Sequence, residues 1–195
     1  MGRVDMLLDG GDNEIGLEST IVDLTTEPPQ ILRPGYITPA MLSEVLGEEI
    51  GLDPALAHPE KDLRPRAPGM KYRHYAPKGE MAIVEGSPEA VTEKINALAK
   101  QAAQAGEKVA VLCKKGRAPL YEAEYVVPAG EGDDLESIAR GLYAALRSFD
   151  DLGATKIYSE SFAPEGDAGS EEAGFYEAVR NRLMKAAGQN VIWAG

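Results

Sequence analysis

Continuous apolar runs alternate with helical stripes over residues 79–195. Five short apolar runs predict strands, at 81–85, 109–113, 124–127, 155–158 and 191–193. Stripes with a spacing of three to four residues predict helices near 88–105, 134–150 and 171–187. Because strands separated by helices join through right-handed crossovers, we expect a small doubly wound α/β domain with a mostly parallel sheet.

Residues 1–60 carry shorter patterns, and three apolar runs there predict strands, at 4–8, 20–24 and 30–33. Thr38 as N-cap and Pro39 at the first helical position predict a helix that continues through Leu46. Three short strands and one helix bury too little surface to fold dependably alone. We therefore expect the tail of a larger α/β domain, whose unpaired strands could form a homo-oligomer.

Between these regions, residues 61–78 form a basic linker with six Lys or Arg and one acid, in a chain of net charge −12. Prolines 65, 68 and 77 with Gly69 exclude a long helix or a central strand. Cations beside imidazole and phenol groups suit a compact polyanion such as a nucleotide. The same composition also suits a solvated linker between domains.

The composition excludes several classes of protein. A net charge of −12 argues against broad binding to tRNA or DNA, which depends on neutralising phosphates. No apolar run approaches the roughly 18 residues of a membrane span, and acids interrupt the N-terminus where a signal peptide would be apolar. The lone Cys113, in a predicted strand, suits a reducing cytoplasm. His58 and His74 are 16 residues apart without paired cysteines, so no metal site is expected.

The α/β region lacks both the G-x-G-x-x-G and the G-x-x-x-x-G-K-[ST] phosphate-binding signatures. Its fourth predicted strand is followed by a long polar stretch, 159–170, at the edge where such folds bind ligands; a mobile loop is the alternative. On the last predicted helix, Asn181 and Arg182 could anchor a loop, a neighbouring domain or a ligand.

Four segments occur in an order that carries a family resemblance: G-L-E-S-T-I-V-D-L at 16–24, I-L-R-P-G at 31–35 followed by I-T, P-G-M-K-Y-R-H-Y-A-P at 68–77, and N-R-L-M-K-A-A at 181–187. This sequence resembles the two-domain L-threonylcarbamoyladenylate synthases, which join a YrdC-type domain to a C-terminal Rossmann-like domain. The resemblance implies a catalytic-domain tail at 1–60, a linker and lid at 61–78, and the Rossmann-like domain at 79–195. Such enzymes convert L-threonine, bicarbonate and ATP, with Mg²⁺, into threonylcarbamoyl-AMP and pyrophosphate for tRNA modification.

The resemblance implies site residues but no catalytic side chain in this sequence. Ser19 is placed at L-threonine, and Arg33, Tyr72, His74 and Tyr75 at ATP, with the linker closing over the nucleotide. Arg33 offers a planar fork of donors suited to phosphate, although a surface ion pair is the alternative. Ser19 could equally bond to backbone. Glu18 and Asp23 are interpreted as structural.

The sequence departs from the family in one respect. It has neither the Lys/Arg-rich N-terminal region nor the Ser-x-Asn motif that such enzymes use to bind ATP and threonine. We therefore expect a C-terminal portion that is inactive alone and whose product, in the parent enzyme, feeds the tRNA-modification machinery. A non-catalytic module that binds a ligand or a partner, or an RNA-binding protein, stays open as an alternative.

Overall fold

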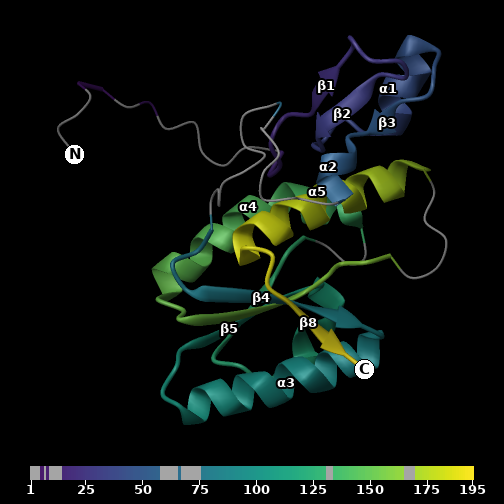
Figure 1. Ribbon diagram of the computed structural model, residues 1–195. Coiled ribbons are helices and arrows are strands. Elements are labelled where there is room, and N and C mark those ends of the chain that lie inside the picture. Colours follow the sequence, from purple (N-terminus) through teal and green to yellow (C-terminus); the bar gives the residue numbers. More distant parts are fainter. Residues whose placement is uncertain are drawn as a thin grey trace.

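The computed structural model describes residues 5, 6, 8, 15–57, 66, 76–130, 134–164 and 170–195. Within this part of the chain lie two separate sheets, one of three strands and one of five (Figure 1). The smaller sheet belongs to the N-terminal region and the larger one to the C-terminal α/β domain. The α/β class expected from the sequence is confirmed.

The larger sheet is parallel throughout. Its strands are β4 (Glu80–Gly86), β5 (Val109–Cys113), β6 (Tyr125–Pro128), β7 (Lys156–Glu160) and β8 (Val191–Ala194). They lie in the order β6-β5-β7-β4-β8, and all four ladders are parallel. The predicted strands and the parallel sheet are therefore confirmed, with bounds that shift by one or two residues.

Three long helices connect these strands: α3 (Pro88–Gln104), α4 (Leu135–Leu152) and α5 (Ser170–Ala187). Local sequence fixes their starts, because Ser87 caps α3 by accepting from the Ala90 amide and Asp134 caps α4 by accepting from the Glu136 amide. A short 3₁₀ helix, η1 (Lys115–Leu120), joins β5 to β6 and was not predicted. Pro119 inside it explains why no longer helix forms there.

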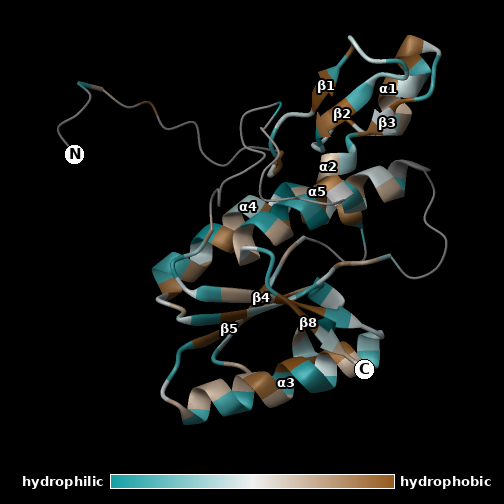
Figure 2. Cartoon of the chain, in the orientation of Figure 1, coloured by the Kyte–Doolittle hydropathy of each residue, from teal (hydrophilic) through white to brown (hydrophobic). Residues whose placement is uncertain are grey.

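The side chains of the large sheet divide between two cores. Alternate residues such as Met81 and Ile83 face α4 and α5, while their neighbours Ala82 and Val84 face α3. Helices therefore cover both faces of the sheet, and hydrophobic residues concentrate along the strands between them (Figure 2). This is the expected three-layer arrangement.

The N-terminal region contains much smaller elements. They are β1 (Ile21–Asp23), β2 (Gln30–Arg33), α1 (Pro39–Leu46), β3 (Gly51–Leu52) and α2 (Pro54–Ala57). Strand β2 pairs antiparallel with β1 and parallel with β3. As predicted, Thr38 caps α1 through its hydroxyl, which accepts from the Met41 amide.

One predicted strand of this region is wrong where it can be checked. Asp5, Met6 and Leu8 have no strand conformation, and the other positions of 4–8 lie outside the described residues. No described strand pairs with these positions, and a strand forms only where its backbone groups find a partner. The strand expected over 20–24 is likewise shorter, at Ile21–Asp23.

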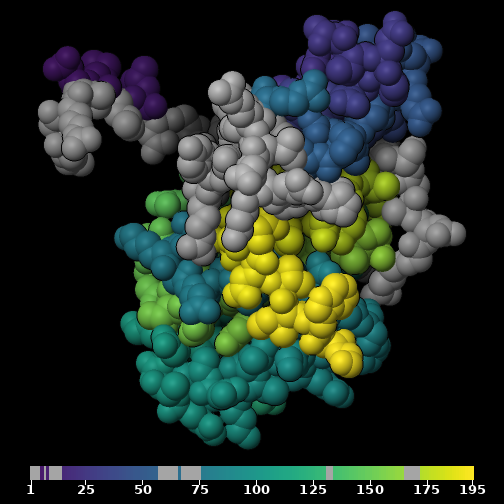
Figure 3. Space-filling model, viewed as in Figure 1, coloured from purple at the N-terminus to yellow at the C-terminus, as the bar shows by residue number. Residues whose placement is uncertain are grey.

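The N-terminal region rests on α4 and α5, on the side of the large sheet opposite α3 (Figures 1 and 3). The Tyr36 hydroxyl donates to Glu136 of α4 at 2.6 Å, and its ring lies 5.4 Å from that of Phe175 of α5. Gly174 lets α1 approach α5, because a Cβ there would lie 2.6 Å from the Thr38 Cβ. The domain boundaries at 60 and 78 stay a prediction.

Candidate functional site

Two of the residues expected at a substrate site lie side by side. Arg33, the last residue of β2, donates from Nε to the Ser19 carbonyl at 3.0 Å and from Nη2 to the Ser19 hydroxyl at 3.0 Å. The β1–β2 register, which pairs Ile21 with Arg33, brings them together. The planar guanidinium thus holds both the backbone and the side chain of Ser19.

A glycine keeps the two residues close. A Cβ at Gly35 would lie 2.3 Å from the Glu18 carbonyl oxygen and 2.6 Å from the Thr20 amide nitrogen. Only glycine therefore allows the chain after Arg33 to pass so near the backbone around Ser19. The Thr20 hydroxyl donates to the Ile37 carbonyl at 2.7 Å and so stabilises the same close approach of the two segments.

Helix α5 anchors this segment from the large domain. Arg182 is only 2% exposed, and its Nη1 lies 3.1 Å from Glu18, the residue before Ser19. Its guanidinium also stands 5.6 Å from the centre of the Tyr143 ring, a cation–π contact. Among the roles left open for Arg182, the structure shows an anchor to the neighbouring region. The contact also agrees with a structural role for Glu18.

Lys185 adds a further cation one turn along α5 and is 9% exposed. Burial lowers the pKa of Lys185; Glu18 opposes this effect, while Arg33 and Arg182 add to it. Arg33, Arg182 and Lys185 thus lie near one another and near the single carboxylate of Glu18, and this excess of positive charge suits a phosphate or carboxylate group. Sequence reasoning missed Lys185, although two cations three residues apart beside the buried Leu183 were a usable signal.

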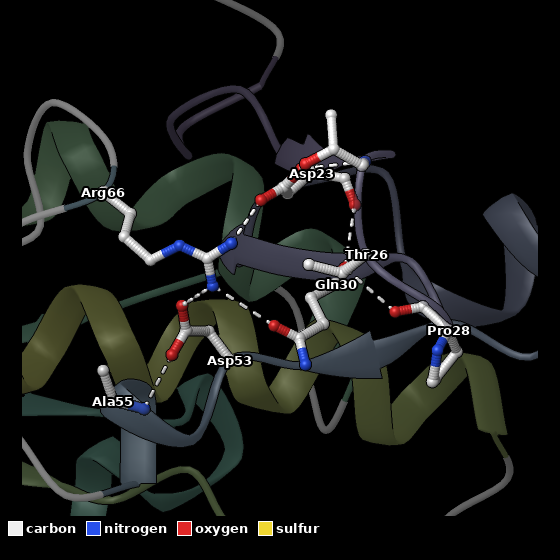
Figure 4. Close-up of polar contacts among 8 residues, drawn as sticks. Asp23, Thr26, Pro28, Gln30, Asp53, Ala55 and Arg66 are labelled. Atoms are coloured by element: carbon white, nitrogen blue, oxygen red, sulfur yellow. Dashed lines mark hydrogen bonds and ion pairs between the residues drawn. The ribbon is translucent and has the colours of Figure 1, made fainter.

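The basic linker is attached to the small sheet through Arg66 (Figure 4). Its guanidinium donates to Asp53 at 3.0 Å and to Gln30 at 3.3 Å, and it also contacts Asp23. Thr25, through its hydroxyl and its amide, and then Arg66 hold the pKa of Asp23 below its ordinary value. The contacts agree with a structural Asp23. Tyr72, His74 and Tyr75 lie outside the described residues.

Other chemistry expected from the sequence can be checked in the described residues. They contain no group of three or more His, Cys, Asp or Glu side chains that could hold a metal ion. No helix among them is both long and apolar enough to cross a membrane. Cys113 is buried in β5, and burial followed by the nearby Glu160 raises the pKa of its thiol to about 12. This agrees with a packed strand residue rather than a nucleophile.

The fold and the junction define a parallel α/β domain with a smaller N-terminal region docked on its helices. The family model for the threonylcarbamoyl-AMP synthase C-terminal domain matches residues 37–188, and the chain belongs to this family. A second family model, described as telomere recombination and covering Sua5, YciO and YrdC proteins, matches residues 1–35. The family recognised from the sequence motifs is therefore confirmed.

Several relatives carry the name threonylcarbamoyl-AMP synthase. The chain is 42% identical to the one from Bacillus subtilis over 98% of its own length and 51% of the relative's. The one from Pyrococcus abyssi is 41% identical over 98% of this chain and 52% of that protein. A crystal structure of P. abyssi Sua5 complexed with L-threonine matches the whole chain with a TM-score of 0.80 and 39% identity. The chain spans about half the length of these relatives.

Proposed function

We propose that this chain forms the C-terminal part of a cytoplasmic threonylcarbamoyl-AMP synthase, which converts L-threonine, bicarbonate and ATP into threonylcarbamoyl-AMP and pyrophosphate. The product would then be used by the machinery that modifies adenosine in tRNA. Family membership and the names of the relatives support this proposal. Because the chain spans about half of those relatives, we assign the activity to the whole enzyme.

The observation that carries the proposal is the contact between Arg33 and Ser19 beside the buried cations of α5. In this proposal Ser19 contacts L-threonine, which is the ligand of the P. abyssi Sua5 structure. Arg33 contacts ATP phosphate, with Arg182 and Lys185 raising the local positive potential. Mg²⁺ would arrive with the ATP phosphates.

We also propose that Tyr72, His74 and Tyr75 close over the nucleotide. Closure would exclude water from a labile carbamoyl adduct. Arg66 supports this placement, because it ties the linker to the sheet that carries Arg33. A solved P. abyssi Sua5 variant has alanine in place of an adjacent histidine and tyrosine, and His74–Tyr75 is the one such pair in this chain.

The test is a chimera in which the unmatched half of the B. subtilis enzyme precedes residue 1 of this chain. We expect the chimera to release pyrophosphate only when L-threonine, bicarbonate and Mg-ATP are all present. This chain alone should release none, because orienting both substrates can lower a barrier by about 7–11 kcal/mol and the Ser-x-Asn motif used for it is absent from these residues.

Arg33→Ala in the chimera should lower kcat/KM for ATP by roughly tenfold or more, since a hydrogen bond to a charged group contributes about 1.5–3 kcal/mol. Arg147→Ala, which removes an exposed arginine of α4, is the matched control. A folded chimera that makes no product would overturn the proposed activity. Equal kinetics for the two variants would remove Arg33 from the ATP site.

A further inference from the structure

A second candidate site lies at the carboxyl edge of the large sheet. There a cavity of about 190 Å³ is bounded by residues at the ends of three strands: Gly86 and Pro88 at the end of β4, Lys114 and Arg117 after β5, and Ser161 and Phe162 after β7. It shares no residue with the Arg33–Ser19 junction. Its wall includes α3, whereas the N-terminal region docks on the opposite face of the sheet (Figure 1).

The connections of the sheet explain why the cavity forms there. Strands β4 and β7 are neighbours, yet β4 continues into α3 on one face while β7 continues into α5 on the other. The segments that follow these two strands therefore diverge as they leave the sheet, and a crevice opens at the carboxyl ends of β4 and β7. Open α/β sheets bind their ligands at such switch points.

The polar wall of the cavity is held firmly in place. Glu160 accepts from the Lys114 amide at 2.7 Å and from Arg117 Nε at 2.6 Å, and it also accepts from the Tyr121 hydroxyl. Arg117 Nη2 in turn donates to the Pro88 carbonyl and to the Thr92 hydroxyl, both at 2.6 Å. Burial, followed by the contact with Glu160, raises the pKa of Tyr121. Every described member of this network is therefore pre-organised.

The charge of the wall favours an anion. Lys114 and Arg117 contribute two positive charges, and Glu160, the one acid among the described residues of the wall, contributes one negative charge. The positive end of the α3 dipole, at Pro88, faces the same space. Lys114 is only 6% exposed, so water screens its charge weakly.

Apolar groups complete the wall and limit what fits. Val91 is 5% exposed and Phe162 is 1% exposed. Phe162 has a φ of 57°, a left-handed conformation that is rare for a bulky residue and gathers at ligand sites. With a volume of about 190 Å³, the cavity suits a small ligand.

We propose that this cavity binds a small anionic metabolite, with one carboxylate or phosphate group near Lys114 and Arg117 and a short apolar part against Val91 and Phe162. The site lies apart from the proposed synthase site and would serve as a regulatory or sensing site of the C-terminal domain. It assigns a ligand to the described residues that follow β7, 161–164, as that position in the fold suggests.

The test is an NMR titration of the full chain with lactate in one arm and inorganic phosphate in the other. We expect saturable amide shifts confined to residues around β4, β5 and β7 in at least one arm, which also identifies the anion class. Lactamide, the neutral analogue of lactate, should cause no saturable shifts. Shifts centred on Arg33 and Lys185 instead would overturn the site without bearing on the synthase assay.

Two variants and one control sharpen the result. Lys114→Gln should weaken binding at least tenfold, whereas Lys100→Gln, at an exposed position of α3, should leave it unchanged. Ala163→Trp fills the cavity from its exposed rim and should abolish binding while every charge is kept. The proposal is overturned if neither anion gives saturable shifts, or if both the Lys114 and Ala163 variants bind as the control does.

Discussion

The two regions of this protein are stabilised in different ways. The C-terminal α/β domain has five parallel strands and two apolar cores, one on each face of its sheet. The N-terminal region has strands of three, four and two residues, and its helix α1 has no buried residue. Few of its side chains are buried, such as those of Ile31, Leu32 and Ile50, so its contacts across the junction carry more of its stability.

This difference predicts which substitutions destabilise each region. The large domain is closely packed, so the loss of one core side chain lowers the stability of the whole domain. The small region depends on a few named contacts with α4 and α5, of which the pair between Arg182 and Glu18 is the most buried. Such a region can detach while the large domain stays folded.

The largest effect should come from Phe149→Ala. Phe149 is fully buried between α4 and the sheet, and such truncations cost about 3–5 kcal/mol. We expect both regions to melt at a lower temperature, because the small one has lost its support. Thermal unfolding followed by circular dichroism measures the change. Val45→Ala, at an 83% exposed position of α1, should shift stability by less than about 0.5 kcal/mol. A similar loss in both variants would contradict the comparison.

The large domain was predictable from sequence for the same reason that it is stable. Its strands are continuous apolar runs, and its helices carry caps such as Ser87 and Asp134 that mark their first turns. Strand and helix signals there agree with the tertiary packing. The 3₁₀ helix at 115–120 was not predicted, because a short segment containing Pro119 shows no helical periodicity in the sequence.

The elements of the small region were predicted less accurately, because they depend on partners far away in the sequence. The two-residue strand β3 forms only by pairing with β2, and it is too short to show a hydrophobic periodicity in the sequence. The strand expected over 4–8 failed where it could be checked. Ser19 and Arg33 came from the family resemblance, and their contact needed the register of β1 and β2. The partner of Arg182 lies 164 positions earlier, beyond any local pattern.

The next largest effect should be local. Arg182→Met keeps the volume of the side chain but removes its 3.1 Å ion pair with Glu18, at a cost of about 1–3 kcal/mol. Amide exchange in β1 and β2 should accelerate roughly tenfold or more, since about 1.4 kcal/mol corresponds to a factor of ten. Exchange in β4, β5 and β7 should stay unchanged.

The matched control for this variant is Arg180→Met, two residues away on α5. Its guanidinium lies 3.9 Å from Glu85 of the large sheet, and its side chain is 39% exposed. Hydrogen exchange of β1 and β2 should therefore stay as in the wild type. If Arg182→Met instead accelerates exchange equally in both sheets, the junction belongs to one cooperative core and the comparison fails.

The smallest effect should come from Asp23→Asn, which sharpens the comparison through its dependence on pH. The pKa of Asp23 is lowered from 3.8 by Thr25 and then by Arg66, so the folded state favours the ionised carboxylate. Its stabilising contribution is therefore fully present above pH 3.8 and is lost as the pH falls through the lower folded-state pKa.

The wild type and the Asp23→Asn variant should differ in β1 and β2 amide exchange at pH 6 and converge on acidification. Added salt should shrink the difference, because the ion-pair partner Arg66 is 43% exposed. Glu44→Gln, at an exposed position of α1, controls for the loss of a charge in the same region. A difference that grows on acidification would reverse the sign of the linkage and exclude Asp23 as a carboxylate that holds the linker to the small sheet.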